Sequence, residues 1–246
     1  MKFLTATISN AGGRNINQDD LQFVLLNTAA CWVVADGLGG HRGGESASRI
    51  AVKKILTSFK SRPILSPEAI KQHLNSANNS ILKLQEENPD LFSMRTTVTL
   101  LISDYNAVLW AHIGDSRLYH FRSGRIIFQT KDHSVPQALA AAGDIRPDEI
   151  RFHEDRNRLL HSLGQKGELR PSILQQKQPL QRGDAFLLCT DGFWEYVTET
   201  EMEVDFAMAN HPNDWLKRME KRILERARAE FDNYSATAVF VENAHK

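Results

Sequence analysis

The sequence lacks long apolar runs and has very little cysteine. No stretch approaches the roughly 18 to 20 apolar residues that cross a bilayer, and the opening MKFLTATISNAGGRN has no apolar block of the kind found in secretory signals. We therefore expect a cytoplasmic protein with no membrane partner. The two cysteines, Cys31 and Cys189, each lie inside an apolar run, which favours buried free thiols over a disulfide framework.

An excess of charge of one sign is also missing. Thirty Lys and Arg residues balance thirty Asp and Glu residues in the 246-residue chain, so no net field would attract the protein to nucleic acid or to an anionic membrane. The hydrophobic fraction is 41% and the charged fraction is 24%, which is typical of globular proteins and excludes disordered, collagen-like and coiled-coil chains. The length allows one large domain or two small ones, and either can bury a substantial core.

Segments typical of strands and helices come in blocks. β-branched and aromatic runs predict strands at Leu21–Leu26, Cys31–Ala35, Thr96–Ile102, Val108–Ile113, Leu118–Phe121, Ala185–Cys189 and Ala236–Val241. Helical periodicity is clearest over Glu45–Phe59, Pro67–Glu87 and Trp215–Phe231. A doubly wound parallel sheet would need strict alternation, so the pattern predicts an α+β fold of mostly antiparallel sheet covered by helices.

Two segments leave alternatives open. The helix Trp215–Phe231 is rich in basic residues and could bind a partner, but charges around an apolar stripe favour a solvated outer face packed on a sheet. Residues 132–169 are polar and irregular, which predicts a loop or small subdomain inserted between strands. We expect substrate contacts in this insertion.

Acidic residues stand at five predicted strand ends. They are Asp36, Asp115 and Asp191 after apolar runs, and Asp19 and Asp232 before the first and last strand. Any one of them could be a turn residue, because Asp-Gly pairs are common in hairpins. If the strands are neighbours, however, the carboxylates converge and repel one another unless a cation neutralises them.

Oxygen-only ligands favour Mg²⁺, Mn²⁺ or Ca²⁺, whereas zinc would favour His and Cys, and the sequence has no HExxH or CxxC spacing. Four or five acids are more than one Mg²⁺ usually takes from a protein, so we expect two metal ions. Such a pair can hold a bridging hydroxide for attack at phosphorus.

A glycine-rich segment, ADGLGGHRGGE at residues 35–45, stands before a predicted helix as a dinucleotide-binding turn would. The spacing argues against that reading, because the last required glycine is missing and Lys60 stands where a ribose-binding acid is expected. Arg14 is the candidate for direct phosphate binding, since a guanidinium matches two phosphate oxygens. The alternative for Arg14 is a solvated loop residue.

Eight short motifs, taken together and in order, resemble those of the metal-dependent serine/threonine protein phosphatases of type 2C, the PPM family, in their compact bacterial form. The motifs are RNINQD (14–19), DGLGGHRGGESAS (36–48), RTT (95–97), GDSRLY (114–119), KDHS (131–134), SLG (162–164), LLCTDGFWEYV (187–197) and DN (232–233). The resemblance implies a single domain over residues 1–246, built as an α-β-β-α sandwich of two mostly antiparallel sheets flanked by helices, with a small flap insertion over residues 132–169. We expect this domain to act as a monomer.

The resemblance also implies roles for individual residues. Metal ligands are implied at Asp19, Asp36, Gly37, Asp115, Asp191 and Asp232, and catalytic roles at Arg14, Asp36 and Asp191. Asp36 matches the carboxylate that bridges two Mn²⁺ or Mg²⁺ ions, and Gly37 matches a ligand that acts through its backbone carbonyl. Asp115 and Asp191 match the pair that holds a third, weaker metal ion.

The implied activity is direct hydrolysis of phosphoserine and phosphothreonine in proteins by a metal-bridging hydroxide, opposing a cognate serine/threonine kinase that acts on the same targets. The alternative is a catalytically inactive module that binds phosphoproteins or serves as a scaffold. Loss of a metal-binding acid would mark that alternative, and none is lost here. His41 and His133 could protonate the leaving group, although each is better explained as a residue that holds a loop.

Three positions depart from the family pattern. Arg95 stands where glycine is usual, Gln18 where many relatives have Glu, and His161 where arginine is frequent. We expect Arg95 to be tolerated at a surface position and Gln18 to be compatible with activity. His161 is expected to alter the chemistry of the flap.

Overall fold

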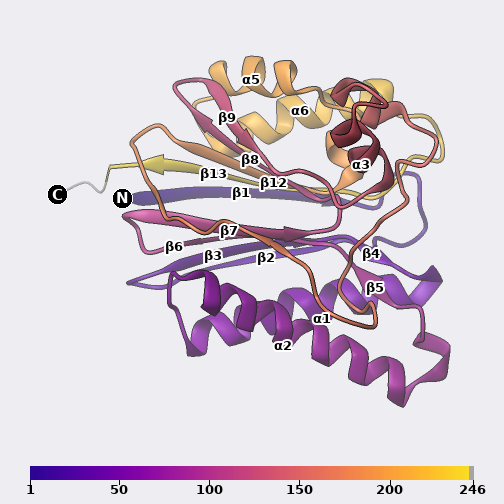
Figure 1. Ribbon diagram of the computed structural model, residues 1–246. Helices are drawn as coiled ribbons and strands as arrows, with labels where there is room; N and C mark the ends of the chain where they lie inside the picture. The colour runs from indigo at the N-terminus through magenta and orange to yellow at the C-terminus, as the bar shows by residue number, and fades with distance from the viewer. Residues whose placement is uncertain (244–246) are drawn as a thin grey trace.

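Two β-sheets pack face to face, with helices on both outer faces (Figure 1). The computed structural model describes residues 1–243, with only the backbone for residues 40–42. The first sheet has the order β1 (Lys2–Asn10), β13 (Tyr234–Glu242), β12 (Ala185–Cys189), β8 (Arg117–Arg122) and β9 (Arg125–Gln129). The second has the order β10 (Ser172–Ile173), β7 (Ala107–Ile113), β6 (Val98–Ser103), β3 (Ala30–Ala35) and β2 (Asp20–Leu25), and β11 (Gln178–Pro179) also pairs with β7.

A short ribbon of β4 (Gly37–Leu38) and β5 (Arg95–Thr96) lies at one end of the sandwich (Figure 1). Every strand pair within residues 1–243 is antiparallel. The long helices are α1 (Gly40–Ser61) and α2 (Pro67–Glu87) on the second sheet, and α5 (Glu199–Ala207) and α6 (Pro212–Arg226) on the first. The shorter ones are η1 (Pro89–Leu91), α3 (Val135–Ala142), η2 (Pro147–Phe152) and α4 (Asp191–Trp194).

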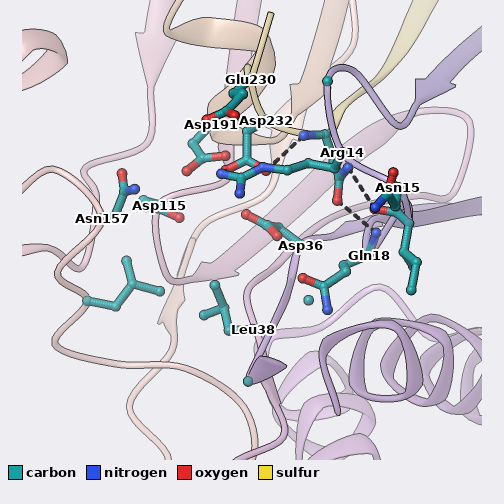
Figure 2. A pocket seen from close by; sticks show the side chains of 16 residues that line it. Arg14, Asn15, Gln18, Asp36, Leu38, Asp115, Asn157, Asp191, Glu230 and Asp232 are labelled. Carbon is teal, nitrogen blue, oxygen red and sulfur yellow. Dashed lines mark hydrogen bonds and ion pairs between the residues drawn. The ribbon is translucent and has the colours of Figure 1, made fainter. Parts of the chain in front are cut away.

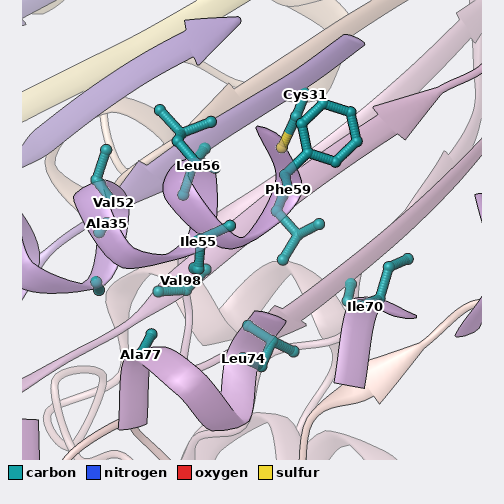
Figure 3. Close-up of a cluster of buried hydrophobic side chains, with 14 of the residues drawn as sticks. Cys31, Ala35, Val52, Ile55, Leu56, Phe59, Ile70, Leu74, Ala77 and Val98 are labelled. Atoms are coloured by element: carbon teal, nitrogen blue, oxygen red, sulfur yellow. The ribbon is translucent and has the colours of Figure 1, made fainter. Parts of the chain in front are cut away.

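The layers follow from the alternation of side chains along the buried strands. In β3, Cys31 and Val33 pack in the core beneath α1 and α2, while Trp32 and Val34 pack between the two sheets. The side chains of β12, in the first sheet, alternate in the same way. Leu187, for example, faces the core under α6. Figure 3 shows the core between the second sheet and the helix pair. The predicted α+β sandwich is confirmed.

The long helices begin and pack as the sequence predicts. The Ser66 hydroxyl accepts a hydrogen bond of 3.2 Å from the Ala69 amide, and Pro67 occupies the first position of α2. Helix α6 buries Trp215 and Met219 against the first sheet. Lys217 and Lys221 are exposed on the outer face of this packed helix, as favoured above, while Arg222 and Arg226 form ion pairs with α5.

Some predicted boundaries are wrong. The last helix ends at Arg226 rather than Phe231, because the chain turns there to bring Asp232 to the end of the sandwich. The strand predicted over Thr96–Ile102 is divided at Thr97, since Thr96 pairs with β4 and the following residues pair in the second sheet. The pattern also missed β1 and β9, which lie at the two edges of the first sheet and are only partly buried.

Both cysteines are buried and free, as expected. Burial raises the pKa of both thiols well above the usual range, which keeps them protonated and unreactive. Within residues 1–243, no helix has the length and apolar character that a bilayer crossing requires.

Candidate active site

A cavity of about 600 Å³ opens at one end of the sandwich. Strands of both sheets begin or end there, so residues distant in sequence meet at its wall. The lining residues are Gly13, Arg14, Asn15, Ile16, Gln18, Asp36, Gly37, Leu38, Gly39, Asp115, Asn157, Leu159, Asp191, Glu230, Asp232 and Asn233.

Four aspartate side chains gather in this cavity. One side-chain oxygen from each of Asp36, Asp115 and Asp191 lies within 4.8 Å of the other two. Figure 2 shows these side chains and that of Asp232 pointing toward a common space, with the guanidinium of Arg14 beside them. The convergence follows from the topology, because β3, β7 and β12 all end at this side of an antiparallel sandwich.

Asp19 is the fifth predicted acid, and it is buried close to this cluster. The Thr190 hydroxyl donates a 3.0 Å hydrogen bond to Asp19 Oδ2, and Thr190 precedes Asp191 directly. The other oxygen, Asp19 Oδ1, is buried and accepts no hydrogen bond from the described residues. The same is true of Asp115 Oδ1. Each orphaned oxygen is a free ligand atom in a buried position.

Burial raises the pKa of these carboxyl groups, and their mutual repulsion raises it further. Burial, with smaller contributions from neighbouring acids, raises the pKa of Asp19 and of Asp115 to about 7. For Asp36 and Asp191, burial followed by repulsion from the surrounding carboxylates raises the pKa well above the usual range. A hard divalent cation would relieve this repulsion through oxygen ligands, so the donor set fits Mg²⁺ or Mn²⁺.

Hydrogen bonds and close packing fix Asp36 at the end of β3. The Asp36 amide donates to Thr97 Oγ1 at 3.0 Å, and the Thr96 hydroxyl donates to the Asp36 carbonyl at 2.7 Å. The next residue, Gly37, has no room for a side chain, because a Cβ there would collide with the carbonyl oxygens of Gly44 and Gln18. The backbone of Gly37 therefore stays at the cavity wall.

Arg14 lies in the loop that joins β1 to β2. Its Nη2 is 3.4 Å from Asp232 Oδ2, and the two side chains are 55% and 42% exposed. The guanidinium is thus held at the rim of the carboxylate cluster but remains open to an incoming anion. The structure brings together Asp36, Asp115, Asp191, Asp232, Gly37 and Arg14 around one cavity, with Asp19 buried close by. Their individual roles stay predictions.

His133 is absent from the cavity lining. Its Nδ1 accepts a 3.3 Å hydrogen bond from the Gly114 amide, and its Nε2 lies 2.9 Å from Ser172 Oγ. Burial and the neighbouring rings of His112 and His161 lower its pKa to about 3. A neutral His133 that joins loops fits this geometry better than a general acid. The side chain of His41 lies outside the described residues.

Two departures from the family pattern have clear local consequences. The Arg95 side chain is exposed, and its backbone pairs with β4 in ordinary strand geometry, so glycine is not required there. The ring of His161 packs edge-on against His133, with centroids 5.4 Å apart. An arginine at this position would lack that ring contact.

The sequence reasoning missed several lining residues. Asn157 and Leu159 reach the cavity from the 132–169 insertion, which lies between β9 and β10 and includes α3 and η2. Glu230 was missed for another reason, since a helix was predicted up to Phe231, and Asn233 also lines the cavity. The motif DN pointed to Asn233, but only its aspartate was given a role.

Comparison with known proteins identifies the family. Residues 9–233 match the family model described as Protein phosphatase 2C. The chain belongs to the protein phosphatase 2C family. The resemblance inferred from the eight motifs is confirmed, and so is the class of enzyme, a protein phosphatase.

Individual relatives of this protein phosphatase 2C chain agree. A serine/threonine phosphatase, Stp, of Listeria welshimeri is 35% identical over 176 residues, which are 70% of this chain and 69% of the relative. The crystal structure of the Mycobacterium tuberculosis serine/threonine phosphatase PstP/Ppp superposes with a TM-score of 0.86 at 27% identity, covering 98% of this chain and 99% of that one.

One solved structure bears on the metal. The catalytic domain of the serine/threonine phosphatase PstP, described in complex with two manganese ions, has a TM-score of 0.83 and 26% identity to this chain, covering 98% and 99% of the two chains. The present protein phosphatase 2C chain has an acidic cluster of the kind that holds such ions.

Proposed function

We propose that this protein phosphatase 2C member hydrolyses phosphoserine and phosphothreonine in proteins, using two Mn²⁺ or Mg²⁺ ions. The observation that carries the proposal is the convergence of Asp36, Asp115 and Asp191 in one cavity, where burial and mutual repulsion raise their pKa values. Such a cluster is unfavourable by itself and is stabilised by divalent cations. The relatives are named serine/threonine phosphatases, which supports the same reaction.

The proposed ligands surround the cavity. Asp36, Asp191 and Asp232, together with the carbonyl oxygen of Gly37, would hold the two ions, with Asp36 shared between them. Asp115, with Asp191, would offer a third and weaker position. Bound ions would supply an acidified water as nucleophile and would offset negative charge on the phosphate.

Other residues at the cavity would bind the substrate next to the proposed metal site. Arg14 stands at the rim with its guanidinium open to solvent, where it can pair with two phosphate oxygens. Asn157 and Leu159, from the 132–169 insertion, line the cavity on another side, which supports the proposal that this insertion is a flap that contacts the substrate protein. We further propose that the phosphatase acts as a monomer and opposes a serine/threonine kinase.

The inactive alternative is not favoured, because every predicted metal-binding acid is present and placed at or beside the cavity. The test is phosphate release from matched peptides containing phosphoserine, phosphothreonine or phosphotyrosine, with Mn²⁺ and with excess chelator. We expect Mn²⁺-dependent release that is faster from the phosphoserine and phosphothreonine peptides. Equal release in chelator, or no release from any peptide, would contradict the proposed function.

A further inference from the structure

Asn233 is a buried asparagine whose side chain connects two parts of the chain more than 200 residues apart. Its Nδ2 donates to the carbonyl oxygens of Ala11 at 2.8 Å and Ile16 at 3.0 Å. Its Oδ1 accepts from the Gln18 amide at 2.8 Å. Two carbonyl acceptors and one amide donor fix the orientation of the Asn233 amide without ambiguity.

Two of these partners, Ala11 and Ile16, stand on either side of Arg14 in the sequence. Residues 11–18 form no strand or helix, so sheet hydrogen bonds do not determine their path. Ala11 precedes Arg14 by three residues and Ile16 follows it by two, and both are held by the same Nδ2 group. The turn itself is closed by a 3.0 Å hydrogen bond from the Arg14 amide to the Ala11 carbonyl. The side-chain amide of Asn233 anchors both ends of this turn, from which the Arg14 side chain extends, to the end of the sandwich.

The neighbour of Asn233 lies in the carboxylate cluster. Asp232 lines the cavity, and Arg14 Nη2 lies 3.4 Å from its Oδ2. Asp232 belongs to the carboxylate cluster, and Asn233 holds the loop that carries Arg14. These two adjacent residues thus fix the position of Arg14 relative to the carboxylates that surround the proposed phosphate position. A misplacement of about 1 Å in such an arrangement can cost roughly 100-fold in rate.

Asparagine is the side chain that meets these requirements. Aspartate would place a carboxylate against the carbonyl oxygens of Ala11 and Ile16. Alanine would remove the three side-chain hydrogen bonds to the loop, although the Ala11 carbonyl would keep its other hydrogen bond, which it accepts from the Arg14 amide at 3.0 Å. Asn233 is 5% exposed, so water could not easily replace these hydrogen bonds. The backbone amide of Asn233 donates to Asp232 Oδ1 at 2.8 Å, and this bond remains possible in an alanine variant.

We propose that Asn233 is a positioning residue for phosphate binding, which holds the 11–18 loop so that Arg14 faces the carboxylate cluster. This inference rests on the proposed function. It predicts that the effects of Asn233 and Arg14 on phosphate binding are coupled, although no hydrogen bond or ion pair among the described residues joins their side chains.

The test is a double-mutant cycle on the Mn²⁺-loaded enzyme, with inorganic phosphate as the probe and its inhibition constant as the readout. Arg14→Ala should raise the constant about 10- to 100-fold, as expected for loss of a charge-assisted contact. Asn233→Ala should raise it about tenfold in the unmodified background and produce no further rise when Arg14 is already alanine. Asn233→Ser takes the same place in the cycle if the alanine variant is insoluble.

Two controls separate positioning from general destabilisation. Asn78 is equally buried at 5% exposure and accepts a 2.8 Å hydrogen bond from the Gly164 amide, so Asn78→Ala should lower the melting temperature without changing the phosphate constant. Calorimetric Mn²⁺ affinity should change less than about threefold in Asn233→Ala, since the bond to Asp232 is retained.

An Asn233 effect of equal size with and without Arg14, or no effect at all, would overturn the inference. The phosphate constant of the unmodified chain reports on the proposed function, whereas the cycle reports on Asn233 alone.

Discussion

Asp191→Asn should reduce the hydrolysis of a phosphothreonine peptide at least about 1,000-fold at saturating Mn²⁺. The substitution removes a charged ligand at the centre of the cluster, where Asp191 lies within 4.8 Å of both Asp36 and Asp115. A bound metal supplies several kcal/mol of transition-state stabilisation, and about 4 kcal/mol corresponds to this loss of rate. Initial rates of phosphate release for the two proteins measure the effect.

Asp90→Asn is the matched control, because Asp90 is an exposed aspartate in η1, outside the cavity lining. Its rate should equal that of the unmodified chain. A rate for Asp191→Asn within tenfold of the unmodified chain would show that Asp191 does not hold a catalytic metal.

In the absence of bound metal, the same carboxylates should make the unmodified protein less stable at neutral pH than a variant in which one carboxylate is replaced by an amide. In excess chelator, Asp115→Asn should exceed the unmodified chain in free energy of unfolding by about 2 to 4 kcal/mol at pH 8. Burial raises the folded-state pKa of Asp115 to about 7, from an ordinary value of 3.8. The folded chain therefore binds a proton between these values that the unfolded chain does not, so stability falls as the pH rises through 7.

The advantage of Asp115→Asn should decline toward zero as the pH is lowered from 8 to 4, where the carboxyl group is protonated in both states. The lowered pKa values of His73 and His133 make the free energy of unfolding rise with pH in both proteins. This contribution cancels when the free energy of the unmodified chain is subtracted from that of the variant. Urea unfolding at several pH values measures the difference. With saturating Mn²⁺ the order should reverse, since the unmodified chain binds the ion more tightly. A pH-independent difference in chelator would contradict this account.

The features that the sequence predicted are those with a local physical cause. The Ser66-Pro67 start of α2 is set by capping within four residues, and the buried strands β3 and β12 are set by their apolar runs. The shared position of Asp36, Asp115 and Asp191 followed from their place at strand ends, because an antiparallel sandwich brings such ends together.

The features that the sequence did not predict depend on distant partners. Strand β1 is only partly buried and has its register from pairing with β13, which no local pattern encodes. Helix α6 ends before Ala227 although its periodicity continues. Asn233 is the clearest example, since its partners Ala11, Ile16 and Gln18 lie at the other end of the chain and contribute backbone groups, which have no sequence signature.

The central claim is that aspartates from separate strand ends hold divalent metal ions for phosphate hydrolysis. A crystal soaked in Mn²⁺, measured at a wavelength where manganese scatters anomalously, tests it most directly. We predict two strong anomalous peaks in the cavity, one of them in contact with both Asp36 and Asp191. Anomalous density that is absent from this cavity in crystals of the active enzyme would contradict the account.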